Sequence, residues 1–264
     1  MRLKNLGSGS GGNATLIHAD GHPGECLMVD CGMGIRELER RVEAAGKQPQ
    51  DIRGIFITHE HGDHAGCAES WSRKYDCPVL LSRGTWHGLK DPQFGGGMQF
   101  VRDGERYPFH GLDLRPFTVP HDAREPLQLR IADRDVHLGI LTDLGHVTPH
   151  VIESLLGVHT LILECNHDPD MLRTGRYPPS LKKRVGGDWG HLTNAQAGAV
   201  LQRVWHRSMH QLIAAHLSEA NNTPELVLNT LVQALPEDHD TTLIVAAPDT
   251  GTDWIDVGFA VQST

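Results

Sequence analysis

The chain has 264 residues and a formal net charge of −9 at pH 7, with 24 Lys and Arg against 33 Asp and Glu. This balance excludes a generally basic coat for nucleic-acid binding, and the 39% of apolar residues excludes a disordered chain. No apolar run approaches the roughly 20 residues that span a bilayer, and the first residues lack the apolar segment of a secretion signal. We therefore expect a cytoplasmic protein.

Short apolar runs, bounded by turn residues and rich in β-branched side chains, predict β-strands. Some of these runs alternate with polar residues and others are continuous, which is typical of half-exposed and fully buried strands respectively. In chain order, the predicted strands cover residues 26–29, 55–57, 79–81, 112–119, 127–131, 136–141, 160–163, 212–215, 242–246 and 255–261.

Three segments between these strands have the spacing and the capping residues of α-helices. The first has apolar residues on one face from Ile35 to Val42 and stops at Gly46. The second begins with the capping box of Thr193 and Gln196, and the third begins at Thr223 with a proline in its first turn. Helices interspersed with strands predict an α/β domain with mixed sheets.

Histidine is unusually frequent: its 18 residues outnumber Phe, Trp and Tyr combined. Histidine is the commonest metal ligand and the usual general acid or base near neutral pH, so a functional site is sought first among the histidines. The five cysteines include no C-x-x-C pair, which argues against both a thiolate zinc site and a disulfide framework. We expect these thiols to be reduced and buried.

One polar segment places four potential metal ligands directly after the predicted strand 55–57. A rigid strand fixes where the loop begins, and a tight turn at its glycine lets the side chains converge on one hollow. Two imidazoles, followed by a carboxylate–imidazole pair, can serve two neighbouring cations. These ligands are His59, His61, Asp63 and His64.

This H-x-H-x-D-H motif resembles the signature of the metallo-β-lactamase-fold hydrolases. Asp30, which closes the predicted strand 26–29, matches the first acidic motif of that family. The resemblance implies a single hydrolase domain over residues 1–264, folded as an αββα sandwich of two mixed β-sheets flanked by helices. Four further segments are similar to the YycJ/WalJ-like branch, which is kin to ribonuclease Z and the phosphodiesterase PhnP: SGSGGN (8–13), CNHD (165–168), GHLTN (190–194) and AHLSEANN (215–222).

Three more predicted strands deliver a histidine or an aspartate: His121, Asp143 and His216. The resemblance implies a dinuclear centre in which Asp143 bridges two cations. One cation would be held by His59, His61 and His121, and the other by Asp63, His64 and His216. His110 and His137 compete with His121 for its place, and Asp143 could instead end its strand in an Asx-turn.

Catalytic roles are assigned to His191, Asp63 and Asp30. The resemblance implies that His191 faces the leaving group or the non-bridging phosphate oxygens, and our hypothesis is that it donates a proton to the leaving oxygen, although it could also be a loop histidine bonded to backbone. Asp30 would orient a metal-bound imidazole, unless it is merely solvated in a turn. His167 is a weaker candidate for the substrate site.

Residues 171–187 contain five cations and no carboxylate. Such a segment is either a solvated loop or an arm that binds phosphates beside the metal centre, because Lys and Arg contacts to phosphates supply most sequence-independent affinity for nucleic acid. Its cations are Arg173, Arg176, Lys182, Lys183 and Arg184.

The leading interpretation is a metal-dependent phosphodiester hydrolase, most specifically a nuclease that degrades DNA from the 5′ end. Two divalent ions, Mn²⁺ or Zn²⁺, would generate a bridging hydroxide. Two alternatives stay open: a phosphodiesterase acting on cyclic or nucleotide substrates, and a non-catalytic partner in a signalling pathway. The resemblance also implies a connection with DNA repair, whereas the native metal, the choice of DNA or RNA and the oligomeric state are left open.

Overall fold

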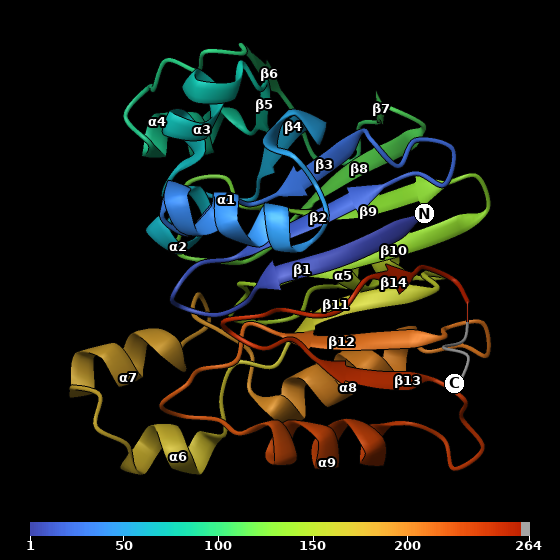
Figure 1. Cartoon of the computed structure of the whole chain (residues 1–264). Coiled ribbons are helices and arrows are strands. Elements are labelled where there is room, and N and C mark those ends of the chain that lie inside the picture. Colours follow the sequence, from blue (N-terminus) through green and yellow to red (C-terminus); the bar gives the residue numbers. More distant parts are fainter. Residues whose placement is uncertain (260–264) are drawn as a thin grey trace. The chain divides into compact units, whose positions relative to one another are not determined.

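Strands and helices alternate along the chain in the computed structural model, which describes residues 1–259 (Figure 1). They form two mixed β-sheets flanked by helices, which confirms the predicted α/β class. The chain divides into two units. The first comprises Met1–Thr118, Ala123–Asp135 and Ala246–Asp256, and the second comprises Val119–Asp122, Val136–Val245 and the residues from Val257. The single hydrolase domain over residues 1–264 stays a prediction.

The first unit contains a sheet in which antiparallel and parallel strands meet at its fourth member. In hydrogen-bonding order the strands are β14 (Ile255–Asp256), β1 (Arg2–Gly7), β2 (Ala14–His18), β3 (Cys26–Val29), β4 (Ile52–Ile57), β5 (Val79–Leu81) and β6 (Met98–Phe100). Pairing is antiparallel from β14 to β3 and parallel from β3 to β6. The parallel strands β3 and β4 therefore end at the same edge. β14 is shorter than the predicted strand 255–261, of which residues 260 and 261 lie outside the described residues.

Three antiparallel strands and several short helices complete this unit. β8 pairs with both β7 and β9. The strands are β7 (Tyr107–Phe109), β8 (Leu112–Thr118) and β9 (Leu127–Asp133). The helices are α1 (Ile35–Ala44), the 3₁₀ turn η1 (Pro49–Asp51), α2 (Gly62–Ala65), α3 (Ala68–Tyr75) and α4 (Arg83–Gly88).

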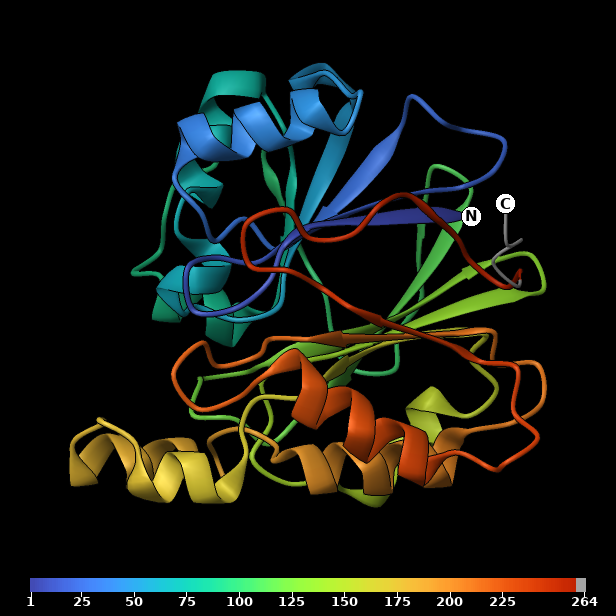
Figure 2. The same ribbon diagram turned by 60° about the horizontal axis from the view of Figure 1, so that its bottom comes forward.

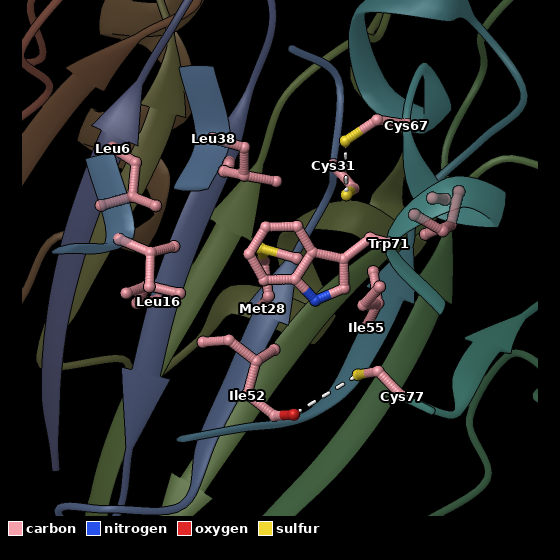
Figure 3. Close-up of a cluster of buried hydrophobic side chains, with 14 of the residues drawn as sticks. Leu6, Leu16, Met28, Cys31, Leu38, Ile52, Ile55, Cys67, Trp71 and Cys77 are labelled. Carbon is pink, nitrogen blue, oxygen red and sulfur yellow. Dashed lines mark hydrogen bonds between the residues drawn. The ribbon is translucent and has the colours of Figure 1, made fainter. Parts of the chain in front are cut away.

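The core of the first unit is built around Trp71, whose side chain is fully buried. Figure 3 shows its indole between the strands and the helices, with Met28 and Ile55 next to it. Leu38, on the apolar stripe of α1, reaches the same cluster. Burial of each such side chain stabilises the fold by about 1.5–3 kcal/mol. The ends of β3 and β4, after which Asp30 and His59 follow, therefore rest on a rigid core.

The second unit contains four parallel strands, paired in the order β10 (Val136–Leu141), β11 (Thr160–Glu164), β12 (Gln211–Ala215) and β13 (Thr242–Val245). α8 (Asn194–Val204) and α9 (Pro224–Ala234) pack on each other and cover one face of these strands (Figure 2). α6 (Pro169–Thr174) and α7 (Pro179–Val185) project to one side (Figures 1 and 2). α5 (Pro149–Leu155) contacts α8.

The predicted helices are confirmed. α8 begins with a capping box in which Thr193 Oγ1 accepts from the Gln196 backbone N–H and Gln196 Oε1 accepts from the Thr193 N–H. α9 is capped by Thr223, and α1 ends before Gly46, whose φ is 73°. Within residues 1–259, no helix combines the length and the apolarity needed to cross a membrane.

The loop interpretation of residues 171–187 is wrong over most of its length, because α6 and α7 occupy it. Asp168 caps α6 by accepting from the backbone N–H groups of Asp170 and Met171, and Pro169 occupies the first turn. α7 likewise starts with a proline, but it buries no side chain. A helix this short, with only Leu181 and Val185 as apolar residues after its proline, gives too little apolar periodicity to be predicted from the sequence.

Candidate metal centre

Three candidate residues follow strands in a backbone conformation that L-amino acids rarely adopt. Asp30 follows β3 with φ 62°, while Asp143 and His216 follow β10 and β12 with φ 56° each. The left-handed conformation costs roughly 1–2 kcal/mol per residue. Strain of this kind clusters at functional sites, so the backbone itself marks these three positions.

In the first unit, β4 and α2 gather four of the candidate ligands. His59 lies two residues beyond β4, and His61 is the N-cap residue of α2, which carries Asp63 and His64. His59 Nε2 lies 3.1 Å from His61 Nδ1. Metal–nitrogen bonds of about 2.0–2.1 Å at a tetrahedral angle place two ligand nitrogens about 3.4 Å apart. The two histidines therefore have the spacing of a pair that shares a cation.

Asp30 is hydrogen-bonded to the imidazole of His64. Its Oδ2 accepts a hydrogen bond from His64 Nδ1 at 2.7 Å, and its Oδ1 accepts from both the backbone N–H and the hydroxyl of Thr58 at 2.9 Å. A carboxylate on one ring nitrogen fixes the tautomer, so the other nitrogen can act as a metal ligand. The predicted role of Asp30 requires this geometry and stays a prediction.

The segment 8–13 packs on the turn that carries Asp63 and His64. Asn13 donates twice to the Asp63 carbonyl oxygen, from its backbone N–H at 2.8 Å and from Nδ2 at 3.2 Å. The carbonyl of Asn13 accepts from Gly32 N–H at 3.0 Å, and a Cβ at position 32 would lie only 1.7 Å from the Asp63 oxygen. Only glycine permits this close approach, which fixes the position of the turn.

In the second unit, Asp143, Glu164, His191 and His216 offer ligand atoms that all lie within 4.8 Å of one another. His191 Nδ1 is 2.7 Å and His216 Nδ1 is 3.2 Å from Glu164 Oε1. Asp143 Oδ1 lies 3.6 Å from His191 Nδ1 and 3.5 Å from His216 Nδ1. Imidazole nitrogens and carboxylate oxygens without a thiolate fit Zn²⁺ and Mn²⁺. The donor set thus has the chemistry of the implied metal centre.

Glu164 is a functional candidate that the sequence analysis missed. It is fully buried at the end of β11, and its second oxygen accepts from the backbone N–H groups of Leu192 and Leu144. Burial alone would raise the pKa of this carboxyl, but the charges and hydrogen bonds of His191 and His216 hold it well below its usual range. The signal in the sequence was a lone glutamate that closes an apolar strand.

His121 is buried beside His191, with ring centroids 5.3 Å apart. Its Nδ1 donates to the carbonyl of Gly190 at 3.1 Å, which leaves Nε2 as the nitrogen suited to a cation. Burial lowers the pKa of His121 and so favours the neutral imidazole, the form that binds metals.

The two competitors of His121 lie elsewhere. His110 is half-exposed and faces Glu25, whose carboxylate oxygen is 3.1 Å from its Nδ1. His137 stacks on His159 with ring centroids 5.7 Å apart. His121 is therefore the one of the three that adjoins His191.

The predicted substrate residues are more dispersed. His167 is buried, with its Nδ1 3.2 Å from Asn166 Oδ1, and its carbonyl accepts from Asn194 N–H at the start of α8. Arg173 pairs with Asp170 on α6. The remaining four lie on or just before α7: Arg176, Lys182, Lys183 and Arg184.

Comparisons with known proteins agree with this chemistry. The family model described as the metallo-beta-lactamase superfamily matches residues 7–176. Exodeoxyribonuclease YycJ of Bacillus anthracis is 33% identical over 88% of both chains, and exodeoxyribonuclease WalJ of Streptococcus pneumoniae is 29% identical over 94% of both. The crystal structure of Zn²⁺-bound PqqB from Methylobacterium extorquens superposes with a TM-score of 0.74 at 16% identity, covering 97% of this chain and all of that one.

Proposed function

The chain belongs to the metallo-beta-lactamase superfamily and is a metal-dependent hydrolase, and on that premise we propose that it is a nuclease that degrades DNA from the 5′ end. The observation that carries the proposal is its similarity, along nearly the whole chain, to two proteins named exodeoxyribonucleases. The fold alone would not decide the substrate, because a fold hosts many chemistries.

The proposed centre takes its ligands as the family resemblance implies. One cation is assigned to His59, His61 and His121. The other is assigned to Asp63, His64 and His216, with Asp143 as the bridge. Support within the first unit is the 3.1 Å spacing of His59 and His61. Support within the second unit is the close grouping of Asp143, His191 and His216 around Glu164.

Two bound cations would lower the pKa of a shared water and neutralise charge on a bound phosphodiester. The protein keeps the ligand imidazoles in one orientation: Asp30 fixes His64, and Glu164 fixes His216. Because His191 is held through Nδ1 by Glu164, its Nε2 is the atom that would donate a proton to the leaving oxygen. The leaving oxygen would otherwise depart as a costly alkoxide.

The charge distribution is compatible with a nucleic-acid substrate despite the net charge of −9. Of the cations of α7, Lys183 and Arg184 are exposed and Lys182 is partly buried, and together they form a local positive surface in an acidic chain. Such a surface binds phosphates without sequence preference, while the net negative charge limits non-specific binding elsewhere. We therefore place the bound DNA on the Lys and Arg side chains of α7, in the unit that carries His191.

The deciding experiment uses the full chain with Mn²⁺ or Zn²⁺ and single strands labelled at the 5′ or the 3′ end, in DNA and in RNA. We expect labelled mononucleotides to appear first from 5′-labelled DNA. Asp63→Ala should abolish the activity, and Asp135→Ala, which removes an exposed carboxylate in the turn after β9, should leave it unchanged.

Three other results would contradict the proposed function or its assigned metal centre. Hydrolysis of cyclic or nucleotide diesters with none of DNA would identify a small-molecule phosphodiesterase. Absence of bound metal in the purified protein, together with inactivity on every diester, would identify a non-catalytic partner. Equal turnover by wild type and Asp63→Ala would show that the assigned metal centre is not responsible for the activity.

A further inference from the structure

Trp189 is an exposed aromatic side chain of the second unit, two residues before His191 in the chain. It is 59% exposed and lies in the short loop between α7 and His191. Single exposed apolar residues are common on protein surfaces and by themselves mean little. What distinguishes Trp189 is how firmly its backbone is held, and by which residues.

The carbonyl groups around Trp189 are tied to the segment that carries His121. Trp189 O accepts from Asp122 N–H at 3.0 Å, and Gly190 O accepts from His121 Nδ1 at 3.1 Å. The loop also packs against the segment that follows Asp143: a Cβ at Gly145 would lie 2.5 Å from Trp189 N. Main-chain contacts thus fix Trp189 between two assigned ligand segments, whatever its side chain is.

Among residues 1–259, the indole has one perpendicular ring neighbour. His146 meets it with centroids 6.2 Å apart and an interplanar angle of 85°. His146 is in turn anchored, because its Nδ1 donates to the Asp188 carbonyl at 2.8 Å. With one edge contact and most of its surface in solvent, Trp189 presents a rigid platform for a flat group.

Cations border this platform. α7 ends at Val185, directly before the loop that carries Trp189, and its last turn contains Lys182, Lys183 and Arg184. Arg184 is directed toward the loop by its ion pair with Asp122, in which Nε lies 2.5 Å from Oδ2, and its side chain is 57% exposed. Exposed cations beside an exposed aromatic ring are the combination that binds single strands, because cations take the phosphates and the ring takes a base.

We propose that Trp189 is the stacking platform for the base of the nucleotide at the scissile phosphodiester, and that the ligand class is single-stranded DNA. The proposal rests on the nuclease function and adds a binding residue to it. A protein partner is the less suitable occupant, because protein interfaces deplete lysine, whereas two lysines lie on α7. Trp189 acts on substrate binding and takes no part in proton transfer.

The first test compares Trp189→Ala and Trp189→Phe on two substrates, a short oligo(dT) and the same strand with an abasic 5′ nucleotide. Removing a stacking ring weakens binding by about tenfold, so we expect KM on oligo(dT) to rise about tenfold in Trp189→Ala and much less in Trp189→Phe. On the abasic strand, wild type and Trp189→Ala should be equal, since there is no base to stack.

Leu156→Ala is the matched control, because it removes an apolar side chain that is 49% exposed in the same unit, at the end of α5. Its KM should stay at the wild-type value on both strands. Equal KM values for wild type and Trp189→Ala on oligo(dT) would overturn the stacking role. So would an equal rise on the abasic strand, because that rise would be independent of the base.

A binding measurement separates this proposal from the nuclease proposal. Oligo(dT) should quench tryptophan fluorescence of the metal-free wild type, and the quenching should be lost in Trp189→Phe. If the wild type cleaves no strand but shows this quenching, the nuclease function fails and the platform stands. If it cleaves oligo(dT) but Trp189→Phe is quenched as strongly as wild type, the platform fails and the nuclease function stands.

Discussion

Glu164 and His191 are joined by a hydrogen bond of 2.7 Å between Oε1 and Nδ1 at the end of β11. The other carboxylate oxygen accepts from the backbone N–H of Leu192, the residue next to His191 in the chain. One buried carboxylate therefore fixes both the ring of His191 and the backbone that carries it. His216 shares the same oxygen at 3.2 Å, so the orientation of two histidines depends on a single side chain.

Replacing Glu164 by glutamine should impair the enzyme in a way that depends on the leaving group. The amide keeps the shape, but one of its two ends is a donor and must face either an imidazole N–H or the Leu192 N–H. Loss of a carboxylate that orients a metal ligand typically costs 10–100-fold in activity or metal affinity.

Glu164 is a positioning residue, and its test separates orientation of His191 from general damage. We expect kcat of Glu164→Gln to fall about 10–100-fold on DNA, and much less on a p-nitrophenyl diester, whose leaving group needs no proton. Glu153→Gln, on the exposed side of α5, is the control and should match wild type. An equal loss on both substrates, at a metal content equal to that of wild type, would contradict the proton-donor role of His191.

The Asp30→Asn variant tests the charge of the Asp30 carboxylate without changing the left-handed conformation of its backbone. Asparagine tolerates the left-handed region nearly as well as aspartate, so the backbone φ of 62° should persist. The amide cannot provide the charged acceptor that His64 Nδ1 now has. We expect metal affinity to fall about 10–100-fold, measured by chelator competition, with the thermal midpoint of the metal-free protein nearly unchanged. Wild-type affinity in this variant would show that Asp30 does not tune His64.

The buried thiols predict a loss of stability in alkaline solution. Burial raises the pKa of Cys26 to about 11 and that of Cys77 to about 12. Above about pH 9 the unfolded chain releases these protons and the folded chain retains them, so stability falls as pH rises toward the folded values. The slope is at most about 1.4 kcal/mol per pH unit for each thiol.

Urea midpoints measured from pH 8 to pH 11 check this expectation. The double variant Cys26→Ala and Cys77→Ala should be less stable at pH 8, because it loses buried volume, but its midpoint should fall less steeply above pH 9. A slope as steep as that of wild type would assign the alkaline loss to other groups.

The fold and much of the candidate site follow from patterns within single segments. Each predicted apolar run contains a strand, because short runs rich in β-branched residues, whether continuous or alternating with polar residues, suit the buried and half-exposed strands of a sheet. The capping residues Thr193 and Thr223 likewise act through hydrogen bonds only three residues away. Strands and helix caps that depend on such short-range interactions can be predicted from the sequence.

What could not be predicted depends on contacts between distant segments. Glu164 resembles a polar residue that ends a strand, and only the approach of His191 and His216 reveals its role. α7 has no fully buried side chain, and its two apolar residues Leu181 and Val185 are too few to give a clear periodic pattern. Gly32 is a further example. The residues around it in the sequence do not predict a turn, and glycine is required there because a side chain would clash with the carbonyl oxygen of Asp63.

Gly32→Ala and Gly34→Ala form a matched pair that tests this close approach. A Cβ at position 32 would lie 1.7 Å from the Asp63 carbonyl oxygen and 2.8 Å from the His64 backbone nitrogen, whereas a Cβ at position 34 meets nothing within 4 Å. The Asp63 turn must therefore move in the first variant only. Overpacking of this kind costs about 1–3 kcal/mol, and we expect Gly32→Ala to lose that much stability in urea unfolding and to bind metal weakly. Gly34→Ala should be close to wild type in both measurements. Equal behaviour of the two variants would show that the contact between Gly32 and the turn does not set the position of Asp63 and His64.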